Sequence, residues 1–411
     1  MRSVARMARW TLHRSKRAGV SWVDFGARRM VAIVRYHSVS DVRDRNHLYV
    51  NRAIAVAPET FERQIEFLAA RYRCVRMDDV AEALDGGKPL PANAVAVTFD
   101  DGYADNHRHA YPILRRHGVP AMFYLVAGCL DGEAPLWPSE VRSIVHRATA
   151  RRLDDPLTGA TWDLRGPGGR EAAIAALKEV LVSLPRGERE AALAELRARC
   201  APEGRAPRVM LTWAEIEEMR AGGMEFGAHT VSHPRLPALP PAEAAAEIRE
   251  SKTRLEARFR APVDHFSYPN PSKGLHVDAG VRRLVAGARF RTAVTSLPGY
   301  VLAADDRLEL KRLVVGARPL DIAWDVERPA LGDALWALVA GDGDEAGGRP
   351  ARLGDLVHDA AAMRIRRLRA AHTAAVAQLG TSAGRALEHI IRADAAAVSA
   401  IRATVGNGGS P

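Results

Sequence analysis

The chain has 411 residues, of which 47% are hydrophobic and 26% are charged, a composition that excludes wholesale disorder and suits one large α/β domain with additions or two domains. The 59 Lys and Arg residues outnumber the 49 Asp and Glu residues, and the net charge of +10 favours anionic over cationic surfaces. We expect no nucleic acid partner, because the arginines are scattered and show no zinc-finger spacing or basic face interleaved with aromatic residues.

The cysteines and the apolar runs predict the compartment. Cys74, Cys129 and Cys200 lie far apart and form no C-x-x-C pair, which argues against a disulfide framework and a cysteine zinc site. The basic N-terminus has no continuous apolar stretch after it, and no window approaches the roughly 20 apolar residues of a membrane span. We therefore expect a cytoplasmic protein without a secretory signal peptide or transmembrane span.

Residues 1–29 form a basic arm in which arginine and lysine side chains stand beside apolar ones, including Trp10. Two interpretations are open. Residues 1–25 could lie on anionic lipid as an interfacial helix, which would place the protein peripherally at the inner face of the membrane. A solvated or frayed helix is the simpler interpretation, and we favour it.

From residue 30 onward, short apolar runs alternate with segments of helical periodicity, the pattern of βα units around a parallel sheet. A strand over 30–36 comes first. The helix over 58–72 begins with Pro58, a residue suited to the first turn of a helix. The next expected elements are a short helix over 78–84, a strand over 94–99, a helix over 109–118 and a strand over 120–128.

Residues 138–206 interrupt this alternation. A loop rich in Gly, Pro and Asp precedes two helical segments over 170–185 and 187–200, and Pro185 ends the first of them. We predict a helical insertion that packs against the barrel wall, with a lid over a site as the alternative. Trp137 and Trp213 flank the insertion, and core packing is favoured over stacking on sugar rings for both.

The alternation resumes at a helix over 211–223, in which Thr212 and Glu215 form a capping box and Gly222 or Gly223 supplies the stop. The remaining expected elements are strands over 224–230, 264–269 and 291–296 and helices over 240–259 and 278–288. The chain then becomes rich in Ala and Arg. We divide it into the basic arm, an α/β domain over 30–325 that contains the insertion, and a helical extension over 326–411.

Polar residues that directly follow strands are the candidates for chemistry, because parallel α/β folds bind ligands at the carboxyl ends of their strands. Asp100 and Asp101 follow the strand over 94–99, and neighbouring carboxylates repel each other unless a cation or a shared proton lies beside them. Successive strand residues point to opposite faces, so both aspartates serve one site only if the backbone turns there, and Gly102 favours such a turn.

His229 and His233 are four residues apart, and a helical turn starting there would place both imidazoles on one side. Two histidines and one aspartate form a three-ligand set that leaves positions for water and substrate, as in a catalytic metal site. One aspartate would then bind a divalent cation together with the histidines. The other would stay near the cation as a base.

With these residues in view, the chain resembles the polysaccharide deacetylase family, also called the NodB-homology family or carbohydrate esterase family four. The segment "TFDDGYADN" is similar to the first motif of the family and "HTVSH" to the second, H-[ST]-x-x-H, in the same order. The resemblance implies a distorted (β/α) barrel that removes N-acetyl groups from an amino sugar. It also implies that Asp101, His229 and His233 bind zinc or another divalent ion and that Asp100 is the general base.

Two motifs depart from the family pattern. The third, R-x-P-[YF], corresponds to "SYPN", with Ser267 in place of the arginine and Asn270 in place of the aromatic residue. The backbone N–H at Asn270 remains the candidate oxyanion donor, and Arg312 is the candidate replacement for the arginine that orients the base.

The late L-x-x-H motif has no histidine in this chain after Leu310. A branch similar to the poly-N-acetylglucosamine deacetylases takes this histidine from the first strand, and "VRYHSV" matches that branch. His37 is therefore the candidate general acid, with a strand-end histidine capped by backbone groups as the alternative.

The leading hypothesis is a metal-dependent N-deacetylase that acts on an acetylated carbohydrate in a polysaccharide, a glycolipid or a smaller glycan. Two alternatives stay open. The altered third and late motifs would suit a non-catalytic carbohydrate-binding relative, although retention of both aspartates and both histidines argues against it. The missing secretory signal would suit a hydrolase of another small C–N (amide) substrate.

Overall fold

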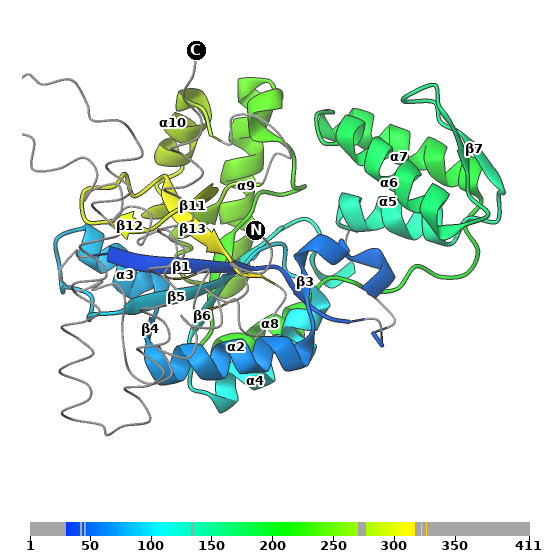
Figure 1. Cartoon of the computed structure of the whole chain (residues 1–411). Helices are drawn as coiled ribbons and strands as arrows, with labels where there is room; N and C mark the ends of the chain where they lie inside the picture. The colour runs from blue at the N-terminus through cyan, green and yellow to red at the C-terminus, as the bar shows by residue number, and fades with distance from the viewer. Residues whose placement is uncertain are drawn as a thin grey trace, which may run out of the picture. The chain divides into compact units, whose positions relative to one another are not determined.

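The structure is a computed structural model that describes residues 30–41, 43–44, 47–132, 135–269, 277–316, 322 and 326 (Figure 1). The chain divides into two units, residues 1–329 and 330–411, and every described residue belongs to the first. The predicted basic arm, with its membrane contact over 1–25, and all of the predicted extension except Val326 lie outside the described residues. No helix among the described residues is both long and apolar enough to cross a bilayer.

Parallel strands close into a barrel. Within the described residues its seven strands follow the order β1 (Met30–Tyr36), β13 (Leu310–Val314), β11 (Thr292–Pro298), β10 (His265–Ser267), β9 (Glu225–Ala228), β6 (Ala121–Leu125) and β5 (Ala94–Phe99). β5 pairs with β1 as well as with β6, with Ala32 opposite Val95 and Tyr36 opposite Phe99, and this pairing closes the barrel. The predicted α/β barrel is thus confirmed.

Three further pairings extend the barrel strands or lie beside them. β4 (Arg73–Val75) runs parallel to the first half of β5, and β12 (Val301–Leu302) runs antiparallel to the start of β1. β2 (Ser38–Val39) and β3 (Ala55–Val56) form a small parallel pair directly after β1.

Helices follow most strands, as βα units require. They are α2 (Pro58–Arg71), α3 (Met77–Leu84), α4 (Tyr111–Arg116), α8 (Trp213–Ala221), α9 (Pro241–Phe259) and α10 (Ala279–Gly287). The predicted capping box at the start of α8 is present, since Thr212 accepts from the Glu215 N–H and Glu215 accepts from the Thr212 N–H. A π-helical turn, η3 (Asn106–Ala110), lies immediately before α4.

Side-chain alternation along the strands separates the barrel interior from the layer under the helices. Ala94 and Ala96 of β5 share an interior core with residues of strands across the barrel, among them Val294 and Leu310. Phe99 faces the other way and stacks on Phe123, with ring centroids 4.6 Å apart. Every second residue of a strand therefore points into the barrel, and the side chains that follow Ala94 and Ala96 at this spacing point inward too.

The helical insertion has a hydrophobic core of its own. Its elements are α5 (Trp137–His146), β7 (Arg152–Asp154), β8 (Thr161–Asp163), α6 (Pro167–Leu181) and α7 (Arg186–Cys200), and Figure 1 shows the three helices side by side. Val141 and Ile144 of α5 meet Leu177 of α6 and Leu193 of α7 in this core. The structure places α5 and the β7–β8 hairpin in part of the segment that we expected to be a loop.

Polar side chains close the amino end of the barrel. Both oxygens of Glu225 accept hydrogen bonds from the first turn of α3, at 2.9 Å from the Met77 N–H and 2.9 Å from the Asp78 N–H. His265 Nε2 lies 2.9 Å from Asp78 Oδ1, and its Nδ1 lies 2.8 Å from Thr292 Oγ1. These three possible metal ligands already have partners, so we interpret them as structural.

Replacement of Glu225 by Ala should lower the free energy of unfolding by about 2 kcal/mol, because two N–H groups at the start of α3 lose a buried acceptor. Urea unfolding measures this change. Glu217→Ala is the matched control on α8, where an exposed ion pair with Arg220 is lost, and it should cost less than about 1 kcal/mol. Equal costs for both variants would contradict the capping role of Glu225.

Candidate active site

Three candidate residues, together with Ser267, meet at the carboxyl end of the barrel because their side chains point inward from different strands or strand ends. Asp100 lies two residues beyond Thr98 of β5, and Arg312 lies two residues beyond Leu310 of β13. The residues brought together in this way are His37, Asp100, Ser267 and Arg312.

The backbone turns sharply between the two aspartates. Asp101 has a φ of 77° and Gly102 a φ of 83°, both in the left-handed region, so Asp101 does not continue the strand. A side chain at Gly102 would also place its Cβ 2.9 Å from Leu125 Cδ2. The turn therefore starts at Asp101 itself, one residue before the glycine, and it brings both carboxylates to the same end of the barrel.

Asp101, His229 and His233 bring three possible ligand atoms together. Asp101 Oδ1 lies 3.5 Å from His229 Nε2 and 3.3 Å from His233 Nε2. Asp101 lies in the turn after β5, and the two histidines lie in the loop after β9.

This set fits a divalent cation. Asp101 Oδ1 is buried and accepts no hydrogen bond of normal geometry from any residue that the structure describes. His229 Nδ1 lies 2.7 Å from the Ser267 carbonyl oxygen, which can only accept, so the proton sits on Nδ1 and the Nε2 lone pair faces Asp101. An acceptor-only carboxylate oxygen and a free imidazole lone pair suit a metal ion.

The two histidines do not lie on a helical turn. Thr230 and His233 have φ values of 67° and 56°, and the segment is an irregular loop. The two imidazoles nevertheless lie close together in an edge-to-face arrangement, with ring centroids 4.9 Å apart. The helical turn that we considered for this spacing is therefore absent, because the four-residue spacing cannot distinguish a turn of helix from a loop with left-handed residues.

Arg312 binds Asp100 with both ends of its guanidinium. Its Nη1 donates to Asp100 Oδ1 at 2.8 Å and its Nη2 to Oδ2 at 2.7 Å, while Nε donates to the Thr295 carbonyl at 2.8 Å. The Ser267 hydroxyl also donates to Asp100, at 3.1 Å. Burial raises the pKa of Asp100, but Arg312 outweighs it, and the net pKa lies below its ordinary value.

His37 lies beside Asp100 at the end of β1, with its Nε2 3.8 Å from Asp100 Oδ2. Burial lowers the pKa of His37 to about 4. Asn106 Nδ2 donates to the His37 carbonyl at 2.7 Å, and Asp105 accepts from the Ser38 hydroxyl at 2.6 Å. The sequence analysis missed Asp105 and Asn106, although they are the last residues of the quoted "TFDDGYADN" motif.

A third residue that the sequence patterns did not indicate is Arg35, the inward residue of β1 before His37. Its Nη1 donates to the Ser296 hydroxyl, and burial together with nearby Arg312 lowers its pKa to about 10. Only the inward position in the strand could have suggested it. Asn270, the predicted oxyanion donor, lies outside the described residues.

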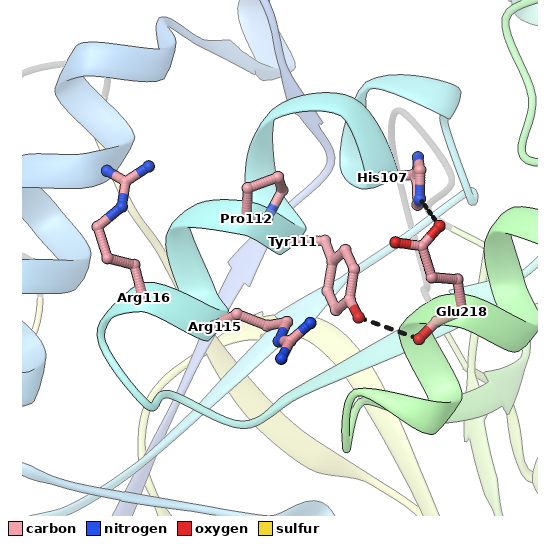
Figure 2. A pocket seen from close by; sticks show the side chains of 6 residues that line it. All are labelled: His107, Tyr111, Pro112, Arg115, Arg116 and Glu218. Carbon is pink, nitrogen blue, oxygen red and sulfur yellow. Dashed lines mark hydrogen bonds and ion pairs between the residues drawn. The ribbon is translucent and has the colours of Figure 1, made fainter.

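A hollow of about 440 Å³ on the flank of the barrel contains none of these residues. Figure 2 shows Tyr111 and His107 from the η3 and α4 segment facing Glu218 of α8. His107 Nε2 lies 2.9 Å from Glu218 Oε2, and the Tyr111 hydroxyl donates to the Glu218 carbonyl at 3.0 Å. These groups are paired with one another, so we do not assign the reaction to this hollow.

A family model described as polysaccharide deacetylase matches residues 87–150 and 192–286 of the chain. The matched segments contain both aspartates and both histidines, whereas His37 and Arg312 lie outside them.

Known proteins similar to the chain match it over short stretches. YxkH of Bacillus subtilis (strain 168) is 26% identical over 127 residues, which are 31% of this chain and 42% of YxkH. The poly-beta-1,6-N-acetyl-D-glucosamine N-deacetylase of Escherichia coli (strain K12) is 32% identical over 102 residues, which are 25% of this chain and 14% of that protein. The chain thus spans less than half the length of these curated relatives.

Among solved structures, that of the Streptococcus pyogenes deacetylase PplD in complex with acetate has a TM-score of 0.48 and 19% sequence identity to the chain. The alignment covers 72% of this chain and 98% of that one.

Replacement of Arg312 by Met should lower the free energy of unfolding by about 3–5 kcal/mol, because Asp100 is left as an unpaired buried charge. Chemical denaturation measures the change. Arg307→Met removes an exposed ion pair with Asp85 and should cost less than about 1 kcal/mol.

The double variant R312M/D100N should recover part of the lost stability, because neither position of the pair then carries an uncompensated charge. If the double variant is less stable than R312M by the full cost of D100N alone, the two side chains are not coupled and the account of this pair is wrong.

Proposed function

Because the chain belongs to the polysaccharide deacetylase family, we propose that it is a metal-dependent hydrolase that removes N-acetyl groups from an amino sugar. The substrate would be an acetylated carbohydrate in a polysaccharide, a glycolipid or a smaller glycan. The observation that carries this proposal is the pair of adjacent aspartates with different partners. Asp101 faces two imidazoles, and Asp100 is held by Arg312 next to His37.

Asp101, His229 and His233 would hold the divalent cation, and we propose zinc. When bound, such a cation supplies Lewis acidity, which polarises a carbonyl group and makes water a stronger nucleophile at neutral pH. The ring of His229 is oriented for this task by its hydrogen bond to the Ser267 carbonyl.

Asp100 would act as the general base. The bidentate contact with Arg312 and the hydroxyl of Ser267 fix the plane and the position of its carboxylate. A fixed carboxylate next to the metal ligands can take a proton from the attacking water without first reorganising its own contacts. Arg312 therefore positions the base, and it does so from β13 where the family motif would supply an arginine at Ser267.

His37 would act as the general acid that protonates the leaving amine nitrogen. Burial lowers its pKa, but the Asp101 and Asp100 carboxylates oppose this shift and favour the protonated form that an acid needs. Its Nε2 lies 3.8 Å from Asp100 Oδ2, so acid and base can reach the same amide group. The Asn106 side chain holds the His37 carbonyl, and Asp105 accepts from the Ser38 hydroxyl and from the Val39 N–H at 3.1 Å. These contacts fix the end of β1 from which the His37 side chain projects.

Metal-dependent acetate release tests the proposed activity. Protein stripped with a chelator and reloaded with zinc or cobalt should release acetate from N-acetylglucosamine oligomers, and His229→Ala should abolish both metal loading and release. Asp100→Asn should load metal but lose about 10²- to 10⁴-fold in kcat, because the base is missing. His107→Ala, on the flank of the barrel, should behave like the parent.

The proposal is wrong if the protein binds the metal but releases acetate from none of the acetylated sugars, with oligomers and glycolipids both tried. A non-catalytic sugar-binding protein or a hydrolase of another small amide would then explain the site better.

The leaving group tests the role of His37. His37→Ala should lower kcat for the N-acetyl substrate by about 10²- to 10⁴-fold, because an amine must be protonated as it leaves. The same variant should lose far less activity on 4-nitrophenyl acetate, whose phenolate leaves without a proton. Equal losses on both substrates would contradict an acid role for His37.

A further inference from the structure

The loop that carries His233 holds two residues in a backbone conformation that side chains disfavour. Thr230 and His233 both have positive φ values, and neither is glycine. Such residues persist in this conformation only where surrounding contacts fix them. The contacts of residues 230–233 therefore decide where the His233 imidazole lies.

The two histidines of the site differ in how they are held. His229 is oriented through its ring, because its Nδ1 is hydrogen-bonded to the Ser267 carbonyl. The Nδ1 atom of His233 is buried but has no hydrogen-bond partner among the residues that the structure describes. Histidines that bind metals are usually oriented through the second ring nitrogen. His233 must instead be positioned through its backbone.

The barrel supplies part of the backbone support. Glu247 of α9 accepts from the N–H groups of Val231 at 2.9 Å and Ser232 at 2.8 Å, and from the Ser232 hydroxyl at 2.6 Å. The Gly128 N–H donates to the Val231 carbonyl at 2.9 Å, and a Cβ at Gly128 would lie 2.7 Å from that carbonyl oxygen. These contacts hold the middle of the loop but not the His233 carbonyl.

Within the loop, the His233 N–H donates to Thr230 Oγ1 at 3.0 Å. The helical insertion supplies further support. Trp137, the first residue of α5, is buried and donates its indole N–H to the His233 carbonyl at 2.9 Å. Arg189 of α7 donates to the Ser232 carbonyl at 3.2 Å and to the Ser232 hydroxyl at 2.8 Å. The Arg189 guanidinium also lies over the Trp137 ring, 5.6 Å from its centroid. Side chains from two helices of the insertion thus donate hydrogen bonds to Ser232 and His233, the last two residues of the loop.

We propose that Trp137 and Arg189 are positioning residues for His233, and that the helical insertion thereby raises the metal affinity of the site. This inference rests on the proposed metal site. It gives the insertion a role other than a lid or passive packing: the insertion braces a ligand loop whose His233 ring has no hydrogen bond at Nδ1 from any described residue. Trp137 is also part of the core of the insertion, which links folding of the insertion to the position of the ligand.

Titration of the metal-free full-length chain with Co²⁺, in competition with a chromophoric chelator, tests the inference. Trp137→Phe keeps the ring but removes the N–H donor, and Arg189→Ala removes both contacts to Ser232. Each variant should weaken Co²⁺ binding about tenfold. This is the smaller of the losses that are typical when a group that holds a metal ligand in place is removed. The visible absorption of bound Co²⁺ should also change, because one imidazole is less well placed.

Two matched controls lie in the same insertion. Trp162→Phe removes an indole N–H that donates to Asp155 at 3.4 Å, and Arg199→Ala removes an exposed ion pair with Glu195. Within the described part of the chain, neither residue has a hydrogen bond or an ion pair with residues 230–233. Both controls should therefore keep the Co²⁺ affinity and spectrum of the parent. Arg189→Lys serves as the conservative partner of Arg189→Ala and should recover part of the affinity.

His233→Ala separates the inference from the metal site on which it rests. His233→Ala alone should lose Co²⁺ affinity, and in that background Trp137→Phe should have no further effect, because Trp137 acts through His233. Bracing is refuted if W137F and R189A keep parental affinity while H233A loses it, or if W137F costs as much without His233 as with it. If H233A itself keeps parental affinity, the proposed metal site is wrong as well.

Discussion

Asp100 and Arg312 meet inside the barrel, with 3% and 1% of their surfaces exposed, and much of the site depends on this ion pair. Removing two charges from water costs several kcal/mol per ion unless the contact geometry satisfies both groups. Here two parallel N–H···O bonds join them. The Ser267 hydroxyl donates a further hydrogen bond to Asp100, and Arg312 Nε donates to the Thr295 carbonyl. Because β1 lies between the strands that carry them, the pair also links β5 to β13 across the position of His37.

The same pair explains how two adjacent carboxylates coexist in a buried place. Arg312 neutralises Asp100, and the left-handed turn at Asp101 directs the second carboxylate to the two imidazoles. Asp100 therefore has a positive partner, and Asp101 is a potential metal ligand. The two carboxylates do not need to share a proton with each other. The division of labour that we propose, with Asp100 as base and Asp101 as metal ligand, follows from this difference in partners.

Local patterns in the sequence predict the elements that are regular and continuous. The buried run over 94–99 and the capping box at Thr212 correspond to β5 and α8. The strand that carries Arg312 is not predicted, because Lys311 and Arg312 make a buried segment look exposed. Contacts between distant segments are equally hidden: Ser267 and Arg312 share Asp100 only because the strand order brings β10 and β13 to it. The spacing of His229 and His233 suggested a helix, whereas the loop is shaped by contacts from α9 and the insertion.

The most direct measurement is a crystal structure of the zinc-loaded protein with anomalous data collected at the zinc absorption edge. We predict an anomalous peak bound by Asp101, His229 and His233, with Asp100 still paired to Arg312. A peak at Asp78, Glu225 and His265, at the opposite end of the barrel, would contradict it, because these residues also bring three ligand atoms together. A zinc ion bound by Asp100 with Arg312 displaced would equally contradict it.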